Sequence, residues 1–201
     1  MEIEELPLKY KKIWKKCLPL FAQGRPGDGT HAKEVVNLIL NYKGKLKINK
    51  DILIPVAMMH DIGHAAILPY HFRYITGPEK IENGKLVHML VGAKIAQDVL
   101  QSVKYDNEAT REIVDIISMH DTDQLKVSDW KKAYTTTNKK IFHDIDALDR
   151  YNERRMRDAA LMYPDRNKFL KLLENFAQQF FYEEFKNIAE NNLMKLKEFK
   201  K

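Results

Sequence analysis

The chain has 201 residues, of which 44% are hydrophobic and 31% are charged, and its formal net charge is +6. This length and apolar content suit a single domain with a real core, and the composition is typical of a helical, intracellular protein, for which we expect a cytoplasmic location. The sequence has no apolar run near the ~20 residues of a membrane span and no recognisable secretory signal, and its single cysteine, Cys17, excludes an intramolecular disulfide and a zinc finger.

Apolar residues recur with helical periodicity along most of the chain, interrupted by polar segments that contain glycine or proline. These breaks are at 24–29, 41–50, 75–85 and 163–167, and the predicted helices are at 7–22, 30–42, 50–66, 86–103, 107–120, 136–162 and 165–199. Asp28 or Thr30 can cap the second helix, and Asn107 can cap the fifth. Strand signals are almost absent, so the expected fold class is all-α.

The chain has seven histidines, all between residues 31 and 143. Helical spacing places four of them on apolar faces of separate predicted helices: His31, His60, His88 and His120. Asp61 lies beside His60, and Asp146 follows Phe142 by four residues on a fifth helix. One such histidine is usually hydrogen-bonded in the core, but several on separate helices would each need a buried partner. One shared divalent cation would satisfy them all, and zinc, manganese, iron, cobalt and nickel accept such ligands.

The order of these residues resembles the HD superfamily of metal-dependent phosphohydrolases. The strings GDGTHAKEVVNLIL and AMMHDIGHA are similar to the helices that carry this family's first histidine and its His-Asp pair. LVHMLVGAKIAQDVL and EIVDIISMHD resemble the segments with the next two histidines of two-metal members, and HDIDALDRY resembles the closing motif. The resemblance extends from about Gly27 to Tyr151 and implies a single-domain, HD-type helical bundle.

The resemblance also implies which residues form the site. His31, His60, Asp61 and Asp146 would hold the first metal, and Asp61 could bridge to a second metal held by His88 and His120. One or two divalent ions are expected, with Mn, Fe, Co, Ni, Mg and Zn as candidates. The catalytic residues would be Asp61 and His64. His64 lies one turn from His60, where it can protonate a leaving oxygen, hold a phosphate, or only support its neighbours through a hydrogen bond.

Substrate-binding residues are expected around this centre. Arg150 lies on the same helix face as Asp146, so its planar guanidinium can bind a phosphate, although a salt bridge within DRYNERRMRD is the alternative. His71 and Arg25 are expected in loops, His71 at the pocket rim and Arg25 before the first histidine. His143 is expected to support its neighbours or to lie near the surface, and Asp149 to be structural. Asp121 could lie next to a ligand, although charged loop residues after a helix are usually solvated.

The expected activity is hydrolysis of an ester or anhydride bond in a small phosphorylated metabolite, with a nucleotide as the favoured class. His64 stands where cyclic-di-GMP phosphodiesterases have a lysine, and their GYP string is missing. HDIGH is closer to the deoxynucleoside triphosphate hydrolases. An HD-fold di-iron oxygenase and a regulatory metal-binding module without catalysis remain alternatives.

Other partners follow from the distribution of charge. The basic residues form no stripe interleaved with aromatic residues, so nucleic acid is not expected as a partner, and neither is a membrane. Association into a homo-oligomer stays open.

The expected domain organisation has three parts. Residues 1–24 form an N-terminal helix on the body, residues 25–162 form the HD metal-binding domain, and residues 163–201 form an additional C-terminal helix packed on the same domain. The last predicted helix is strongly amphipathic, so its aromatic and leucine side chains should pack onto the body.

Overall fold

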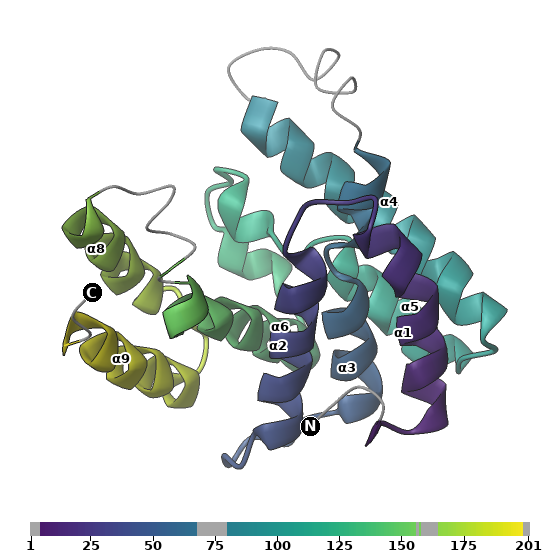
Figure 1. Cartoon of the computed structure of the whole chain (residues 1–201), viewed down its shortest axis with the longest axis horizontal. Coiled ribbons are helices and arrows are strands. Elements are labelled where there is room, and N and C mark those ends of the chain that lie inside the picture. Colours follow the sequence, from purple (N-terminus) through teal and green to yellow (C-terminus); the bar gives the residue numbers. More distant parts are fainter. Residues whose placement is uncertain (1–4, 68–79, 156, 158–164, 199–201) are drawn as a thin grey trace. The chain divides into compact units, whose positions relative to one another are not determined.

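The computed structural model describes residues 5–67, 80–155, 157 and 165–198, except for the side chains of 80–83. All regular secondary structure in these ranges is helical (Figure 1), which confirms the all-α prediction. Within the described chain, no helix combines the length and the apolar character needed to cross a membrane.

The elements follow one another as helices joined by short 3₁₀ turns. The α-helices are α1 (Leu8–Phe21), α2 (Asp28–Asn41), α3 (Lys50–Met59), α4 (Lys80–Ser102), α5 (Asn107–Ile117), α6 (Thr137–Leu148), α8 (Arg166–Ala177) and α9 (Glu183–Glu198). The 3₁₀ turns are η2 (Ile62–Ala66), η4 (Thr122–Gln124), η5 (Trp130–Ala133) and η6 (Asp149–Tyr151).

Several predicted boundaries were wrong. The helix predicted at 50–66 ends at Met59, and a 3₁₀ turn follows the His-Asp pair. The helix predicted at 136–162 ends as an α-helix at Leu148, the one predicted at 165–199 is two helices, and α4 begins at Lys80 rather than at 86. The predicted caps also differ, because Gly27 precedes α2 and the Asp106 side chain accepts the Ala109 N–H at the start of α5.

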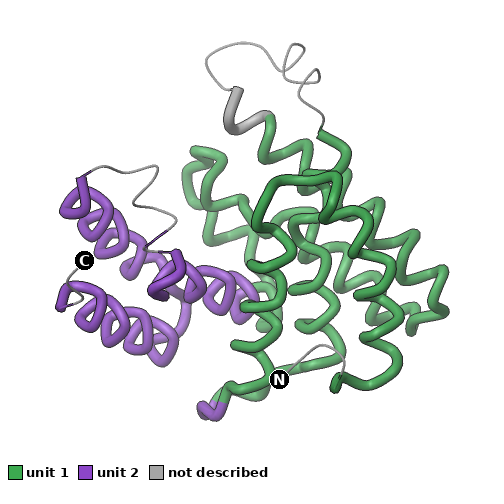
Figure 2. Tube along the Cα trace, viewed as in Figure 1, with its two compact units in different colours: residues 1–42, 46–139 green, residues 43–45, 140–201 purple. Residues whose placement is uncertain are grey.

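The chain divides into two compact units (Figure 2). The first contains Met1–Tyr42 and Leu46–Lys139, and the second contains Lys43–Lys45 and Lys140–Lys201. The domain boundaries expected from the sequence stay a prediction.

Helix α3 is the centre of the first unit. Every residue from Ile52 to Met59 is buried, so this helix is covered on all sides. It packs against α1, α2 and α5, and Figure 1 shows it between α1 and α2. The most buried core side chains around it are Ile13, Cys17, Val35, Ile39, Ala96, Leu100, Ile113 and Ile117. His60 and Asp61, the two residues that follow α3, therefore lie in the interior.

A close backbone contact fixes η2 against α4. A Cβ atom on Gly63 would lie 1.9 Å from the carbonyl oxygen of His88, a distance that no side chain can occupy. Gly92 lies one turn further along α4 and faces Gly63 across the same contact. Because neither residue has a side chain, the turn after the His-Asp pair can lie directly on the helix that carries His88.

In the second unit, α8 and α9 form an antiparallel pair. The Arg166 guanidinium at the start of α8 donates to the Leu196 carbonyl near the end of α9, 2.6 Å away. The chain between the two helices is held by the buried Asp144 carboxylate, which accepts the backbone N–H groups of Phe181 and Tyr182. Asp149 is also buried and accepts hydrogen bonds from the side chains of Asn152, Arg154 and Arg155.

Candidate metal centre

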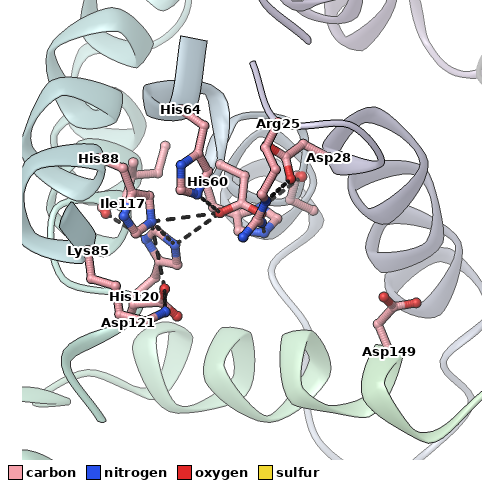
Figure 3. Close-up of polar contacts among 12 residues, drawn as sticks. Arg25, Asp28, His60, His64, Lys85, His88, Ile117, His120, Asp121 and Asp149 are labelled. Atoms are coloured by element: carbon pink, nitrogen blue, oxygen red, sulfur yellow. Dashed lines mark hydrogen bonds and ion pairs between the residues drawn. The ribbon is translucent and has the colours of Figure 1, made fainter. Parts of the chain in front are cut away.

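Five of the six predicted metal ligands lie together inside the first unit. His31 comes from α2, His60 and Asp61 follow α3, His88 comes from α4, and His120 follows α5. Figure 3 shows His60, His88 and His120 pointing toward one another. All five side chains are buried. The packing of α2 and α5 on α3, and of α4 on α5 and η2, therefore brings residues up to 89 positions apart, His31 and His120, into one cluster.

The cluster contains two groups of three donors, each of which could hold a metal ion. One consists of His31, His60 and Asp61, and the other of Asp61, His88 and His120. Within each group the donor atoms lie within 4.8 Å of one another. Asp61 belongs to both groups, so its two carboxylate oxygens can serve two neighbouring ions.

Two of the histidine rings are oriented by the ends of the helices that precede them. Nδ1 of His60 lies 3.1 Å from the Ala57 carbonyl oxygen, and Nδ1 of His120 lies 2.8 Å from that of Ile117. The last carbonyl groups of a helix lack intrahelical partners and can accept such bonds. A carbonyl only accepts, so Nδ1 carries the hydrogen and Nε2 of each neutral ring keeps the lone pair that a metal requires.

Electrostatics make the cluster receptive to a cation. Burial alone would raise the pKa of Asp61, but His60, His120, His31 and Arg25 outweigh it and hold that pKa well below its usual range. Burial lowers the pKa of His88 to about 3. Burial opposes protonation of His120 as well, but the Asp61 carboxylate, with an oxygen 3.7 Å from Nε2, raises the pKa of His120 to about 9. The Nε2 atoms of these two rings are 3.3 Å apart, so one cation could contact both.

A third donor group adjoins the first two and consists of Asp28, Asp61 and His64. Asp28 opens α2 and is buried, and burial together with the Asp61 charge raises its pKa to about 6. Arg25 lies against both acids, with Nε 2.8 Å from Asp28 and Nη2 3.0 Å from Asp61. The sequence signal of Asp28, an acid before a helix, was read as a cap and gave no hint of this role.

His64 lies at the edge of the buried cluster. Its ring stacks on that of His88 with centroids 4.3 Å apart, and its Nε2 is 3.7 Å from an Asp61 oxygen. One fifth of the side chain is exposed, whereas the histidines beneath it are almost fully covered. His64 can therefore meet both the centre and a ligand arriving from solvent.

Asp121 and Lys85 border the cluster on the side away from Arg25 (Figure 3). Lys85 Nζ lies 3.0 Å from Asp121 Oδ2, which is also 3.7 Å from His88 Nε2. Of the two possibilities for Asp121, the structure favours the position beside the site over a solvated one, since only 14% of its side chain is exposed. Burial raises its pKa, but His120 and Lys85 outweigh this effect and lower it. Lys85 was not singled out from the sequence, where it appears as one of many lysines.

The other predicted site residues belong to the second unit or are outside the described residues. Asp146 and Arg150 belong to the second unit, where the Arg150 guanidinium lies 4.7 Å from the centre of the Phe176 ring, and their roles stay predictions. His71 is outside the described residues. His143 is buried, with Nδ1 2.9 Å from Asp144.

The residues of the first unit fit a divalent metal. Imidazole nitrogens and carboxylate oxygens are suitable ligands for several divalent cations. Among the described residues, the buried Oδ2 of Asp28 has no hydrogen-bond partner, and Asp28 belongs to the third donor group. Burying such an atom without compensation is costly, and a cation bound there would offset that cost.

A helical bundle whose buried core contains this His/Asp cluster is typical of a metal-dependent hydrolase domain. The family model of the HD domain matches residues 28–151, well over half of the chain, and the chain therefore belongs to the HD-domain family. No curated protein and no solved structure matches it. Membership of this superfamily of metal-dependent phosphohydrolases supports hydrolytic chemistry in general and leaves the substrate open.

Proposed function

We propose that this protein is a metal-dependent phosphohydrolase that acts on a small phosphorylated metabolite, with nucleotides as the favoured class. The observation that carries the proposal is the shared position of Asp61, which belongs to every donor group in the buried cluster. A carboxylate shared in this way can hold two cations side by side, and two-metal sites are common among enzymes that cleave phosphate bonds.

The proposed first ion is held by His31, His60 and Asp61, with Asp146 as a further ligand. The proposed second is held by Asp61, His88 and His120. Such ions, when bound, polarise a phosphoryl oxygen and lower the pKa of water toward neutrality. The helix-end carbonyls of Ala57 and Ile117 keep the two rings turned so that Nε2 faces the centre.

The remaining roles belong to side chains at the edge of the cluster. His64 is partly exposed and is placed to bind a phosphoryl oxygen or to pass a proton to the leaving oxygen. Arg150 and His71 are proposed as further substrate-binding residues. A nucleotide is favoured over an uncharged substrate because Arg25 and Lys85 place two positive charges beside the cluster.

Metal analysis followed by a phosphate-release screen tests this proposal. Untreated protein is assayed for bound metal and then supplied with Mn²⁺, Co²⁺, Mg²⁺ or Ni²⁺ and with nucleoside monophosphates, nucleoside triphosphates or a generic phosphodiester. We expect metal-dependent release of phosphate or alcohol from at least one of them. Bound metal without turnover of any substrate would contradict the proposal, and oxygen consumption by an iron-loaded sample would favour the oxygenase alternative.

A further inference from the structure

Two cationic side chains flank the cluster, and each is anchored by a carboxylate outside the two proposed metal ligand sets. Arg25 is held by Asp28, and Lys85 is held by Asp121. In Figure 3 they lie on opposite sides of the histidines. The arrangement is therefore a row of charged groups with a cation at each end and the candidate metal centre in its middle.

Arg25 is positioned by a tightly constrained loop. Gly27 has a φ of +95°, and Gly24 packs so close to the Ala65 backbone that a Cβ there would lie 3.3 Å from its nitrogen. The guanidinium uses Nε for Asp28 and Nη2 for Asp61, and Nη1 has no hydrogen-bond partner among the described residues. More than half of the side chain, 54%, is exposed. One edge of a fixed guanidinium is thus open to solvent beside Asp61.

Lys85 is held in a comparable way on the other side. Its partner Asp121 is itself fixed, because Oδ1 accepts a hydrogen bond from Gln124 while Oδ2 accepts one from Lys85. One quarter of the Lys85 side chain is exposed. An ammonium group has three donors, and the carboxylate uses one of them, so the others can bind an arriving anion.

The spacing of these groups indicates what such an anion would be. Arg25 connects to Lys85 through Asp61, His88 and Asp121, by successive contacts of 3.0, 3.7, 3.7 and 3.0 Å. Asp61, His88 and Asp121 stand between the two cations, so each cation can meet a different phosphate group. A chain of linked phosphates can place one group at the centre and others against the flanking cations, where charge-assisted hydrogen bonds are strong.

We propose that Arg25 and Lys85 are two anion-binding arms of this site and that it takes substrates with two or more linked phosphates. This inference rests on the proposed function and deepens it, because it selects phosphoanhydrides over simple monoesters. Asp28 and Asp121 act as positioning residues that hold the arms in place when a cation engages Asp61.

Binding of unreactive ligands to the metal-loaded protein tests this inference independently of turnover. Calorimetry compares inorganic phosphate with methylenediphosphonate, and metal content is measured before and after each titration. We expect the wild-type protein to bind the diphosphonate about 10-fold more tightly, and R25Q and K85Q each to lose most of that preference. The matched controls R111Q and K94Q remove exposed charges from α5 and α4 and should leave it unchanged.

Each result has a definite reading. No preference in the wild-type protein, or an unchanged preference in metal-loaded R25Q and K85Q, would overturn the inference. If R25Q loses metal, R25K keeps the charge beside Asp61 without the planar fork and should retain metal but not the full preference. Loss of metal in both R25K and K85Q would assign these cations to holding the centre and would also overturn the inference. A preserved preference without hydrolysis would contradict only the proposed function.

Discussion

Asp61 is a buried acid whose pKa is nevertheless held well below its usual range. Its oxygens lie 3.6 to 3.7 Å from nitrogens of His60, His64, His88 and His120, and Arg25 donates to one of them. A single negative charge thus contacts most of the histidines of the buried cluster. The neutral amide in D61N has the same shape but cannot supply this charge.

D61N should therefore lose metal from both proposed ligand sets at once. We expect metal content to fall below one ion per chain and phosphate release to fall at least about 100-fold, since even residues that only orient ligands cost 10- to 100-fold. Elemental analysis and the phosphate assay measure both effects. D98N, an exposed acid on α4, is the matched control. Full metal content in D61N would show that Asp61 is not a shared ligand.

The sequence points to the histidines of this site and to Arg25, but it does not show the roles of Asp28 and Lys85. His31, His60, His88 and His120 stand out because each is a polar residue on an apolar helix face. Asp28 and Asp121 stand at helix ends, where acids are common for local reasons, and only the tertiary structure shows that they are largely buried. Lys85 can be recognised as part of the site only through its ion pair with Asp121, which is 36 residues away in the sequence.

The contact between η2 and α4 places the His-Asp pair next to His88, and it depends on a glycine. G63A would push a methyl group into the His88 carbonyl, which cannot move without distorting α4. We expect a loss of stability of about 1–3 kcal/mol or more, together with reduced metal content. Chemical denaturation in chelator measures the first effect, and elemental analysis measures the second.

G29A is the matched control for this substitution. The Cβ that it adds to α2 would lie 3.4 Å from the nearest atom, in the side chain of Phe21, and alanine favours the helix. Its stability should stay close to that of the wild-type protein. Equal stability of G63A and G29A would show that the close backbone contact does not limit the packing of η2 on α4.

The apolar periodicity of the sequence predicts where helices occur. It does not predict where they end, because the ends depend on contacts with residues distant in the sequence. The apolar pattern continues through 178–182, so a single helix was predicted at 165–199. In the structure α8 ends at Ala177 because the following backbone turns toward Asp144, which lies 37 and 38 residues earlier than the N–H groups it accepts. A long-range acceptor thus competes with the local helical hydrogen bonds.

D144A should destabilise the second unit by removing this acceptor. Hydrogen bonds to a charged group contribute about 1.5–3 kcal/mol, so we expect a loss of about 3 kcal/mol. Urea unfolding followed by far-UV circular dichroism measures it. D165A, which removes only the N-cap of α8, should cost about 1 kcal/mol. A loss no larger in D144A than in D165A would contradict the proposed role of Asp144.

The metal should affect the stability of the whole protein in a pH-dependent way. In the metal-free fold, His120 has its pKa raised from 6.5 to about 9, and His88 has its pKa lowered from 6.5 to about 3. The raised pKa of His120 contributes stability that is complete below pH 6.5 and is lost as the pH rises through 9. The lowered pKa of His88 costs stability as the pH falls below 6.5, because the unfolded chain then binds a proton that the folded chain does not.

A metal at this pair must displace the proton of His120, so its stabilising effect should grow as the pH rises toward 9. With Ni²⁺ at 100 times its dissociation constant, stabilisation is about 2.7 kcal/mol, or roughly 5–10 °C in melting temperature for a chain of this size. At one fixed Ni²⁺ concentration, we expect a larger increase in melting temperature at pH 8 than at pH 6, and little increase in D61N at either pH. An equal increase at both pH values would show that metal binding releases no proton from the histidine pair.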